Sequence, residues 1–297
     1  MRALILLLFC ITSINNSAAN ELTKKLSPSF FGSEEIIFSY RPINRDERSL
    51  TAALLLKNGQ RMDLPVQCDP EGGEPSLSDA YSAKLSDGSE ALVITCAYHL
   101  DHSGLGIKGF QYISFVLAET STSLERKENL ESLISGYEGS TEDGTQEHFF
   151  YNEQALAKQK LKDGEIDSPA LIHQVLLSRL AERDYEAIKS YASEKNTKAI
   201  ITRTPIPKTN VSSYNDIGYV LAEANHLDLA LRVLRNVENT SPDRTVLMLN
   251  IADVLWKKEQ RKEAESYYKK YYVKMKIAGK EKIIPNRVAE RLRQGNN

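Results

Sequence analysis

Residues 211–276 decide the fold, because one pattern is written there twice. Residues 211–244 read VSSYNDIGYVLAEANHLDLALRVLRNVENTSPDR, and residues 245–276 read TVLMLNIADVLWKKEQRKEAESYYKKYYVKMK. Similar residues recur 34 positions apart in the pairs Tyr214/Met248, Ile217/Ile251, Gly218/Ala252, Leu221/Leu255, Ala230/Ala264 and Leu234/Tyr268. A further pair, Pro242 and Lys276, differs in kind. A fixed period of this length indicates helical hairpins that stack and bury a continuous core.

Each unit has one small residue in each of its two predicted helices. Helices that cross closely need a small side chain at the crossing point. We therefore predict that Gly218 crosses at Ala230, and Ala252 at Ala264. A glycine inside a helix costs about 1 kcal/mol relative to alanine, which a close contact can offset.

The pattern resembles the tetratricopeptide repeat, a helix-turn-helix unit of the same length. In that family small residues stand at places 8 and 20, where this chain has Gly218 and Ala230 in one unit and Ala252 and Ala264 in the next. Asn250 fits as well, since asparagine often stands at place 6. The resemblance implies an architecture and not an activity.

The resemblance also implies a concave groove that receives a peptide or a partner helix. Places 2, 5, 9, 12 and 13 of the first helices line it: Ser212, Asn215, Tyr219, Ala222 and Glu223 in one unit, and Val246, Leu249, Asp253, Trp256 and Lys257 in the other. The predicted partner-binding residues are Asn215, Tyr219, Glu223, Asp253, Trp256 and Lys257. Tyr219 and Trp256 should contribute most, because aromatic side chains dominate interface energetics. Alternatively, Trp256 packs on the closing helix. The Lys and Asn pattern that holds a C-terminal carboxylate in some members is absent.

The N-terminus reads as a secretory signal at residues 1–19. Arg2 supplies the positive charge, residues 3–14 the apolar core, and Ala18-Ala19 a small-residue cleavage site. The apolar run is short of the roughly 20 residues that a membrane span needs. We predict export, to a periplasm in the first place and to the extracellular medium in the second, with no transmembrane segment after cleavage.

The two cysteines beyond the signal, Cys68 and Cys96, are predicted to form a disulfide. In the chain-entropy model a loop of this length contributes about 3 to 4 kcal/mol. A metal or redox pair is the alternative, but the sequence has no CxxC spacing.

Residues 20–120 are predicted to form an antiparallel β sandwich or barrel. The six expected strands are residues 34–40, 50–57, 61–66, 81–86, 90–100 and 110–119. Asn58-Gly59 and Asp87-Gly88 supply tight hairpin turns between them. The disulfide would tie the end of the third strand to the fifth.

Residues 121–144 are predicted as a helix over 124–137 and a glycine-rich hinge over 136–144 that separates two domains. Residues 145–297 then form the helical domain. It would comprise a helix at 149–161, a hairpin at 169–182 and 185–195 with Ala187 as the small residue of its second helix, repeats at 211–244 and 245–278, and a closing helix at 286–294. The fold class is thus α+β with two domains, the second an all-α solenoid resembling tetratricopeptide repeats.

The charges are unevenly distributed, although the net charge is −2. Residues 20–144 carry 11 basic and 20 acidic groups (−9), and residues 245–297 carry 13 basic and 6 acidic (+7). The basic end suits an acidic partner, or is an ordinary solvated surface. Export disfavours nucleic acid as the partner.

Two features of the β region could carry chemistry. His99, Asp101 and His102 are candidate metal ligands, although an extended strand points His99 and His102 to opposite sides. Gly104, Gly106 and Gly109 spell GxGxxG, but no strand-to-helix context follows, so we predict a hairpin loop without a bound nucleotide. No catalytic residues or cofactor are predicted. The sequence favours an exported, non-enzymatic scaffold that binds a protein. The alternative is an exported hydrolase, metal-dependent for instance, or a carbohydrate-binding protein with its site near His99 to Gly109.

Overall fold

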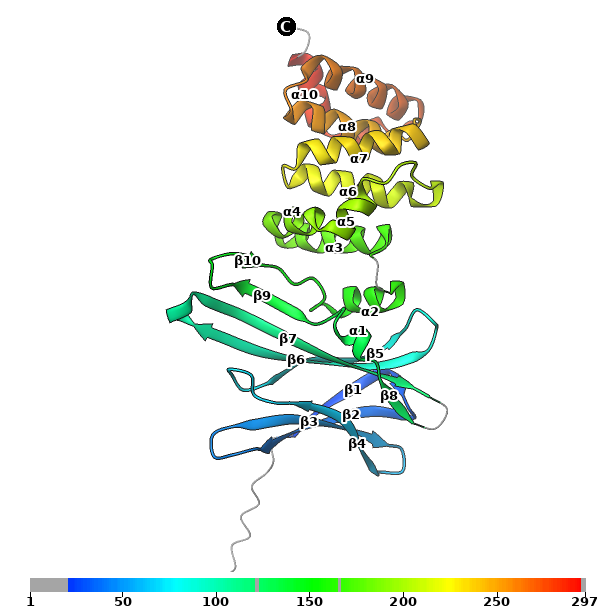
Figure 1. Ribbon diagram of the computed structural model, residues 1–297. Helices are drawn as coiled ribbons and strands as arrows, with labels where there is room; N and C mark the ends of the chain where they lie inside the picture. Colours follow the sequence, from blue (N-terminus) through cyan, green and yellow to red (C-terminus); the bar gives the residue numbers. More distant parts are fainter. Residues whose placement is uncertain (1–20, 121–122, 165–166, 295–297) are drawn as a thin grey trace, which may run out of the picture.

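The computed structural model describes residues 21–120, 123–164 and 167–294, and the predicted signal at residues 1–19 lies outside them. A β-rich N-terminal part with two antiparallel sheets is followed by a helical C-terminal region. The helices stack away from the sheets, so that the last of them lie farthest from the β-rich part (Figure 1).

The first sheet has four strands in sequence order: β1 (Glu21–Phe30), β2 (Ser33–Pro42), β3 (Arg48–Leu56) and β4 (Arg61–Cys68). The last three were predicted, whereas β1 was not. Leu26 and Phe30 are the buried residues of β1, and most of its other residues are exposed. Because so little of β1 is apolar and periodic, its sequence gives no strand signal.

The second sheet consists of β5 (Ser76–Lys84), β6 (Glu90–His102), β7 (Ile107–Glu119), β8 (Leu124–Arg126), β9 (Gly136–Ser140) and β10 (Gln146–Glu147). The order is β10-β9-β7-β6-β5, with β8 also paired to β7, and a single 3-10 turn (Ser103–Leu105) joins β6 to β7. Leu92 and Ile94 share a core with residues of the first sheet, and Val93 lies in another core with Ala157 and Leu161. Both faces of β6 are covered, so its residues form a continuous buried run.

A disulfide joins the two sheets. Cys68 at the end of β4 is bonded to Cys96 in β6, with 6.5 Å between the Cα atoms. Both residues are at most 1% exposed. The structure thus has the predicted bond between the expected third and fifth strands.

The predicted helix and hinge over residues 124–144 are wrong. This stretch contains β8, a single helical turn α1 (Glu128–Glu131), and β9. Two of the three glycines that suggested a hinge, Gly136 and Gly139, are needed for close packing instead. A Cβ on Gly136 would lie 2.5 Å from the Phe149 ring, and one on Gly139 would lie 2.3 Å from the Lys108 carbonyl oxygen.

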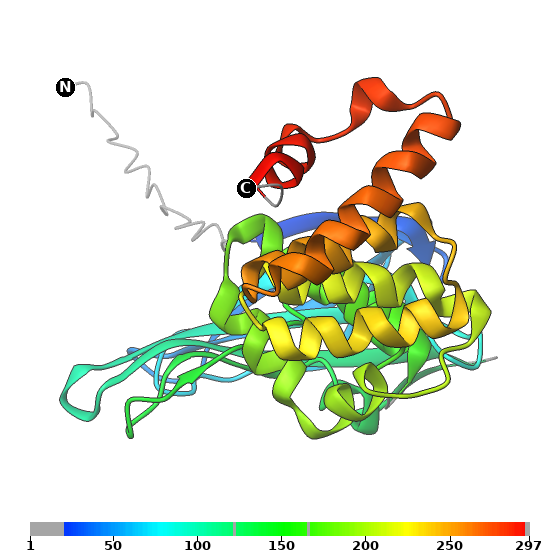
Figure 2. The ribbon, with the colours of Figure 1, turned by 90° about the horizontal axis from the view of Figure 1, so that it is seen from above.

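Helix α2 (Gln154–Asp163) packs on the second sheet, where Ala157 and Leu161 join the core that contains Val93 and Val116. The helices that follow are α3 (Pro169–Glu182), α4 (Tyr185–Ser193), α5 (Lys195–Ile201), α6 (Val211–Glu223), α7 (Leu227–Thr240), α8 (Thr245–Lys257), α9 (Arg261–Ile277) and α10 (Asn286–Gln294), with 3-10 turns at Lys208–Asn210 and Glu281–Ile283. A third core runs through them. Figure 2 shows these helices from above, over the strands of the β-rich part. The hairpins α6–α7 and α8–α9 coincide with the two predicted units.

Three hairpins turn in the same way. Arg183, Asn225 and Glu259 end the first helices with φ of 62°, 60° and 61°. In each, the next N–H donates to the carbonyl five residues back, as in His226 to Leu221 at 2.8 Å. Ala230 and Ala264 stand five residues after this turn residue, but Ala187 stands four after it. Ile188 therefore takes the small-residue place in α4, which corrects the assignment of Ala187.

Candidate functional site

Gly218 fixes the approach of α7 to α6. A Cβ on Gly218 would lie 2.6 Å from both Cγ and Cδ2 of Leu234, and 3.5 Å from the Ala230 carbonyl oxygen. The predicted crossing at Gly218 is confirmed, and Ala252 and Ala264 are fully buried at the equivalent places.

The predicted contact residues on α6 and α8 form what we call the first-helix face: Tyr219, Glu223, Asp253, Trp256 and Lys257. An ion pair of 3.0 Å joins Glu223 to Lys257. The two residues are 34 positions apart, which is one period of the repeat. The Lys257 ammonium also donates to the Ala222 carbonyl oxygen at 2.8 Å. The face is therefore held in place by contacts between neighbouring units.

Asn215, the sixth predicted contact residue, is 1% exposed. Its side-chain oxygen accepts a hydrogen bond of 3.2 Å from the Asn250 amide. Asn215 thus links α6 to α8 inside the stack and presents almost no surface to a partner.

Asp253 is surrounded by donors from the two following helices. Its carboxylate accepts from Tyr268 Oη at 2.6 Å, from Arg287 Nη2 at 2.7 Å and from Arg291. The hydrogen bond to Asp253 is the largest cause that raises the pKa of Arg287. Burial, and then Asp253, raise the pKa of Tyr268. The charge of Asp253 is therefore compensated within the chain.

Trp256 packs on the closing helix, the alternative that the sequence left open. Its ring is partly buried and meets the Tyr268 ring edge-on, with 6.2 Å between centroids. The Arg261 guanidinium lies 4.0 Å from the indole centroid, and that of Arg291 on α10 lies 5.3 Å away. A partner can reach only the remaining exposed part of the indole.

Helix α10 continues the period of the two units. Arg287 follows Asp253 by 34 residues, as Arg291 follows Lys257. Val288 is fully buried, whereas Arg287 and Glu290 are exposed. Helix α10 thus takes the place of a first helix of a third unit and covers the end of the stack with a polar outer side.

Two tyrosines of the helical region have exposed side chains. Tyr219 on α6 and Tyr185 on α4 are each 40% exposed. Burial raises the pKa of Tyr219, and Glu223 raises it further, while Arg287 lowers it. Tyr185 was not predicted, because its hairpin lies outside the period of 34.

The candidates on the β6–β7 hairpin do not form a metal site. His99, Asp101 and His102 are exposed at the end of β6, and the His99 ring packs on Phe110 with 5.1 Å between centroids. Gly104 to Gly109 span the turn and the start of β7. Among the described residues, these three side chains do not bring ligand atoms together.

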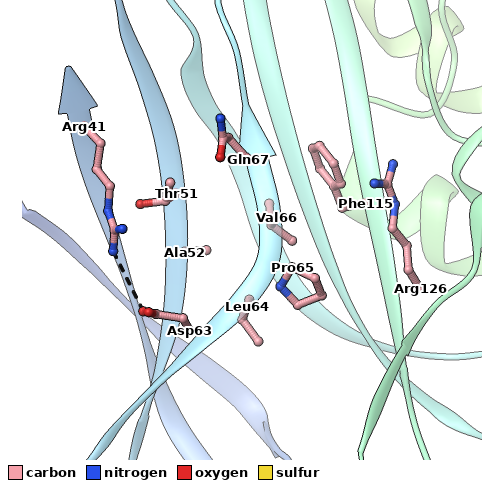
Figure 3. Close-up of a pocket in the computed structure, with 10 residues that line it drawn as sticks. All are labelled: Arg41, Thr51, Ala52, Asp63, Leu64, Pro65, Val66, Gln67, Phe115 and Arg126. Carbon is pink, nitrogen blue, oxygen red and sulfur yellow. Dashed lines mark ion pairs between the residues drawn. The ribbon is translucent and has the colours of Figure 1, made fainter. Parts of the chain in front are cut away.

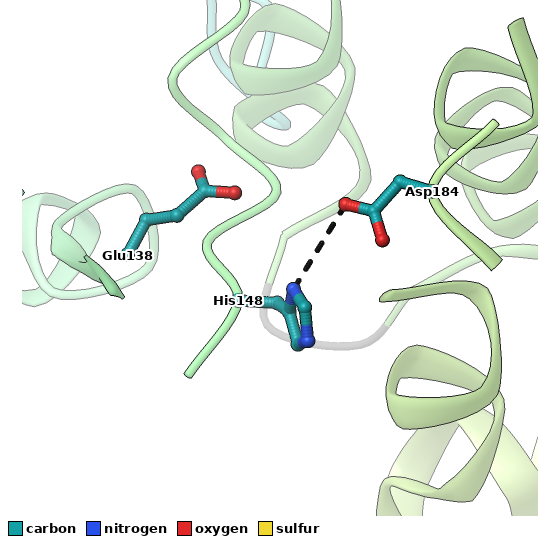
Figure 4. Close-up of side chains that lie close together, drawn as sticks. All are labelled: Glu138, His148 and Asp184. Carbon is teal, nitrogen blue, oxygen red and sulfur yellow. Dashed lines mark ion pairs between the residues drawn. The ribbon is translucent and has the colours of Figure 1, made fainter. Parts of the chain in front are cut away.

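One other cluster could hold a cation: Glu138 of β9, His148 before α2 and Asp184 before α4 (Figure 4). His148 Nδ1 lies 4.0 Å from Asp184 Oδ2. However, Arg179 donates to Glu138 Oε1 at 3.0 Å and to Asp184 Oδ2 at 3.2 Å. The guanidinium already supplies the positive charge there. Sequence reasoning missed this cluster because its members come from three separate elements.

A recess of about 330 Å³ opens between β4 and the strands β7 and β8 (Figure 3). Arg41 and Asp63 face each other across 3.9 Å at its rim, and both are well exposed. Leu64, Val66 and Phe115 form its apolar wall. Asp63 is the single carboxylate among the lining residues, so the recess has no pair of acids for hydrolysis.

In the described part of the chain, no helix is both long and apolar enough to cross a membrane. Comparison of the sequence with models of protein families finds no match. Comparison with curated proteins finds none either.

Proposed function

We propose that this chain is an exported, non-enzymatic scaffold that binds another protein through the first-helix face. In this proposal, residues 211–244 and 245–278 are two units of a solenoid resembling tetratricopeptide repeats, and α10 closes it. The β-rich part is a sandwich whose buried disulfide suits an oxidising compartment. The apparent secretory signal supports export.

The observation that carries the proposal is the exposed Tyr219, which lies one helical turn before the ion pair of Glu223 with Lys257. Interfaces are rich in aromatic anchors, and tyrosine offers much contact area with few rotatable bonds. Glu223 follows Tyr219 by one turn of α6. Ion pairs hold Glu223 to Lys257 and Asp253 to Arg287 before a partner arrives. Because these side chains are already ordered, binding costs less conformational entropy.

The test is affinity capture of partners from the envelope of the source cells, followed by calorimetry with the captured protein. Tyr219→Ala should weaken binding about thirtyfold, the equivalent of about 2 kcal/mol. Tyr272→Ala is a matched control, since Tyr272 on α9 is 39% exposed. It should leave the affinity unchanged.

A third variant separates the two classes of function. Phe110, 45% exposed on the β6–β7 hairpin, is the aromatic residue that a carbohydrate site there would use. Loss of binding in Phe110→Ala with full binding in Tyr219→Ala would transfer the site to the β-rich part.

A further inference from the structure

The outer side of α9 has an exposed apolar pair among lysines. Val273 and Ile277, one helical turn apart, are 53% and 81% exposed. A shallow groove beside them is lined by Lys269, Lys270 and Lys274, with Met248 of α8 and Pro242 of the preceding turn. We call Lys269, Lys270, Val273, Lys274, Lys276 and Ile277 the α9 patch. Helix α9 lies at the end of the molecule remote from the sheets (Figure 1).

The positive charge of the patch is only partly compensated. Lys269 pairs with Glu265, and Lys274 with Asp243 at 2.7 Å. Lys276 makes no ion pair within the described chain. Residues 269–282 contain six lysines and one carboxylate, Glu281 (+6 − 1 = +5). The patch therefore attracts an anionic surface and repels a second copy of itself.

We propose that the α9 patch docks the protein on an anionic lipid surface. Basic helices with exposed apolar residues insert those residues at the headgroup boundary while lysines contact acidic headgroups. Ile277 protrudes, as insertion requires; a peptide groove would instead enclose its apolar residues. The patch shares no residue with the first-helix face. Docking would therefore leave that face free for a partner protein.

The test is sedimentation of the protein with vesicles of phosphatidylcholine alone and of equal parts phosphatidylcholine and phosphatidylglycerol. The protein should bind the mixed vesicles, weakly or not at all the neutral ones, and less at high salt. Each lysine near the surface should contribute about fivefold in affinity. Replacing Lys269, Lys270 and Lys276 by glutamine should therefore reduce binding about a hundredfold.

Two further variants test the site itself. Val273→Ser with Ile277→Ser should also weaken binding, since charge attraction alone would not respond to this change. Lys25, Lys57 and Lys84 are exposed lysines of the β-rich part, and replacing these three by glutamine removes the same charge. This control should bind like the unchanged protein.

Three results would overturn the proposal: no sedimentation with either vesicle, equal loss in the two triple variants, or equal binding to neutral vesicles. A fourth would assign the patch to self-association with the acidic β-rich part. In that case sedimentation velocity without vesicles would show an oligomer for the unchanged protein and a monomer for the α9 lysine variant. Neither protein would bind vesicles.

Discussion

Two residues with opposite properties, Gly218 and Asp253, determine how the helices of the two hairpins pack. Gly218 has no side chain and so admits Leu234 of α7 against α6. Asp253 has a charged side chain and gathers donors from α9 and α10. The first residue sets the distance between two helices, and the second links three helices by charge-assisted hydrogen bonds.

Gly218→Ala should destabilise the helical region. The new Cβ would lie 2.6 Å from Leu234, and overpacking of this kind costs about 1 to 3 kcal/mol. The gain in helix propensity of about 1 kcal/mol leaves a net cost of up to about 2 kcal/mol. Urea unfolding followed by circular dichroism measures the difference, and Gly218→Leu should cost more. Asn239→Ala, on the exposed side of α7, is the control. A Gly218→Ala protein more stable than the unchanged one would contradict the close crossing.

Tyr98 makes the stability of the β-rich part sensitive to alkali. Burial, and then Glu71 and Asp69, raise its pKa to about 12. An unfolded tyrosine titrates near 10. Its contribution is therefore complete below about pH 10 and is lost as the pH rises through about 12, amounting to about 2 kcal/mol. Tyr98→Phe should flatten the fall in unfolding free energy over this range. If the pH profile of that variant is unchanged, the loss of unfolding free energy at alkaline pH comes from other tyrosines.

Whole elements depend on neighbours in different ways. Helices α6 to α9 have strong periodic sequences, and their ends match the predicted units. Strands β9 and β10 are short and exist through pairing with β7 and with each other. Helix α10 is stabilised at the end of the stack by buried Val288 and by the pairs of Arg287 and Arg291 with Asp253.

Arg291→Ala should loosen α10 and expose Trp256. The substitution removes the guanidinium that lies between the indole, Tyr268 and Asp253. Trp256 is the one tryptophan of the chain, so the emission spectrum reports on this place alone. We expect a shift to longer wavelength. The control is Arg293→Ala, whose side chain is exposed on α10. Equal spectra for both variants would show that α10 does not shield the indole.

At the level of the whole molecule, Arg179 connects the sheets to the helices. It is 8% exposed and donates to Glu138 of β9, to Asp184 before α4 and to the Phe149 carbonyl oxygen. A second buried group, Lys160 of α2 with Asp167, lies at the same junction, where Tyr151 and Tyr191 also donate to Asp167. The predicted division at residue 144 would separate Arg179 from Glu138 and α2 from the second sheet.

A fragment of residues 168–297 should fold without the sheets. Its helices contribute almost all of one core, and stacked hairpins contact mainly their neighbours. It should be helical and unfold cooperatively, but with lower stability than the same helices in the intact chain, because Arg179 loses Glu138 and Phe149. Circular dichroism during urea unfolding measures the helix content, the cooperativity and the stability. A fragment of residues 144–297 should be more stable than the shorter one, because it regains the Phe149 carbonyl for Arg179 and Asp167 for Tyr191. An unfolded 168–297 fragment would show that the helical region requires the sheets.

The sequence alone determined the two hairpins of residues 211–278, six of the strands and the disulfide. These features arise from contacts close in sequence, or from cysteines that form a single pair beyond the predicted signal, so periodicity, turn residues and cysteine counting reveal them. The tertiary structure decided the rest. The glycines at 136 and 139 became packing positions, Asp253 was joined to α10, and Glu138, His148 and Asp184 met around Arg179. Each of these depends on segments distant in the chain, and such contacts leave no periodic signal in the residues that make them.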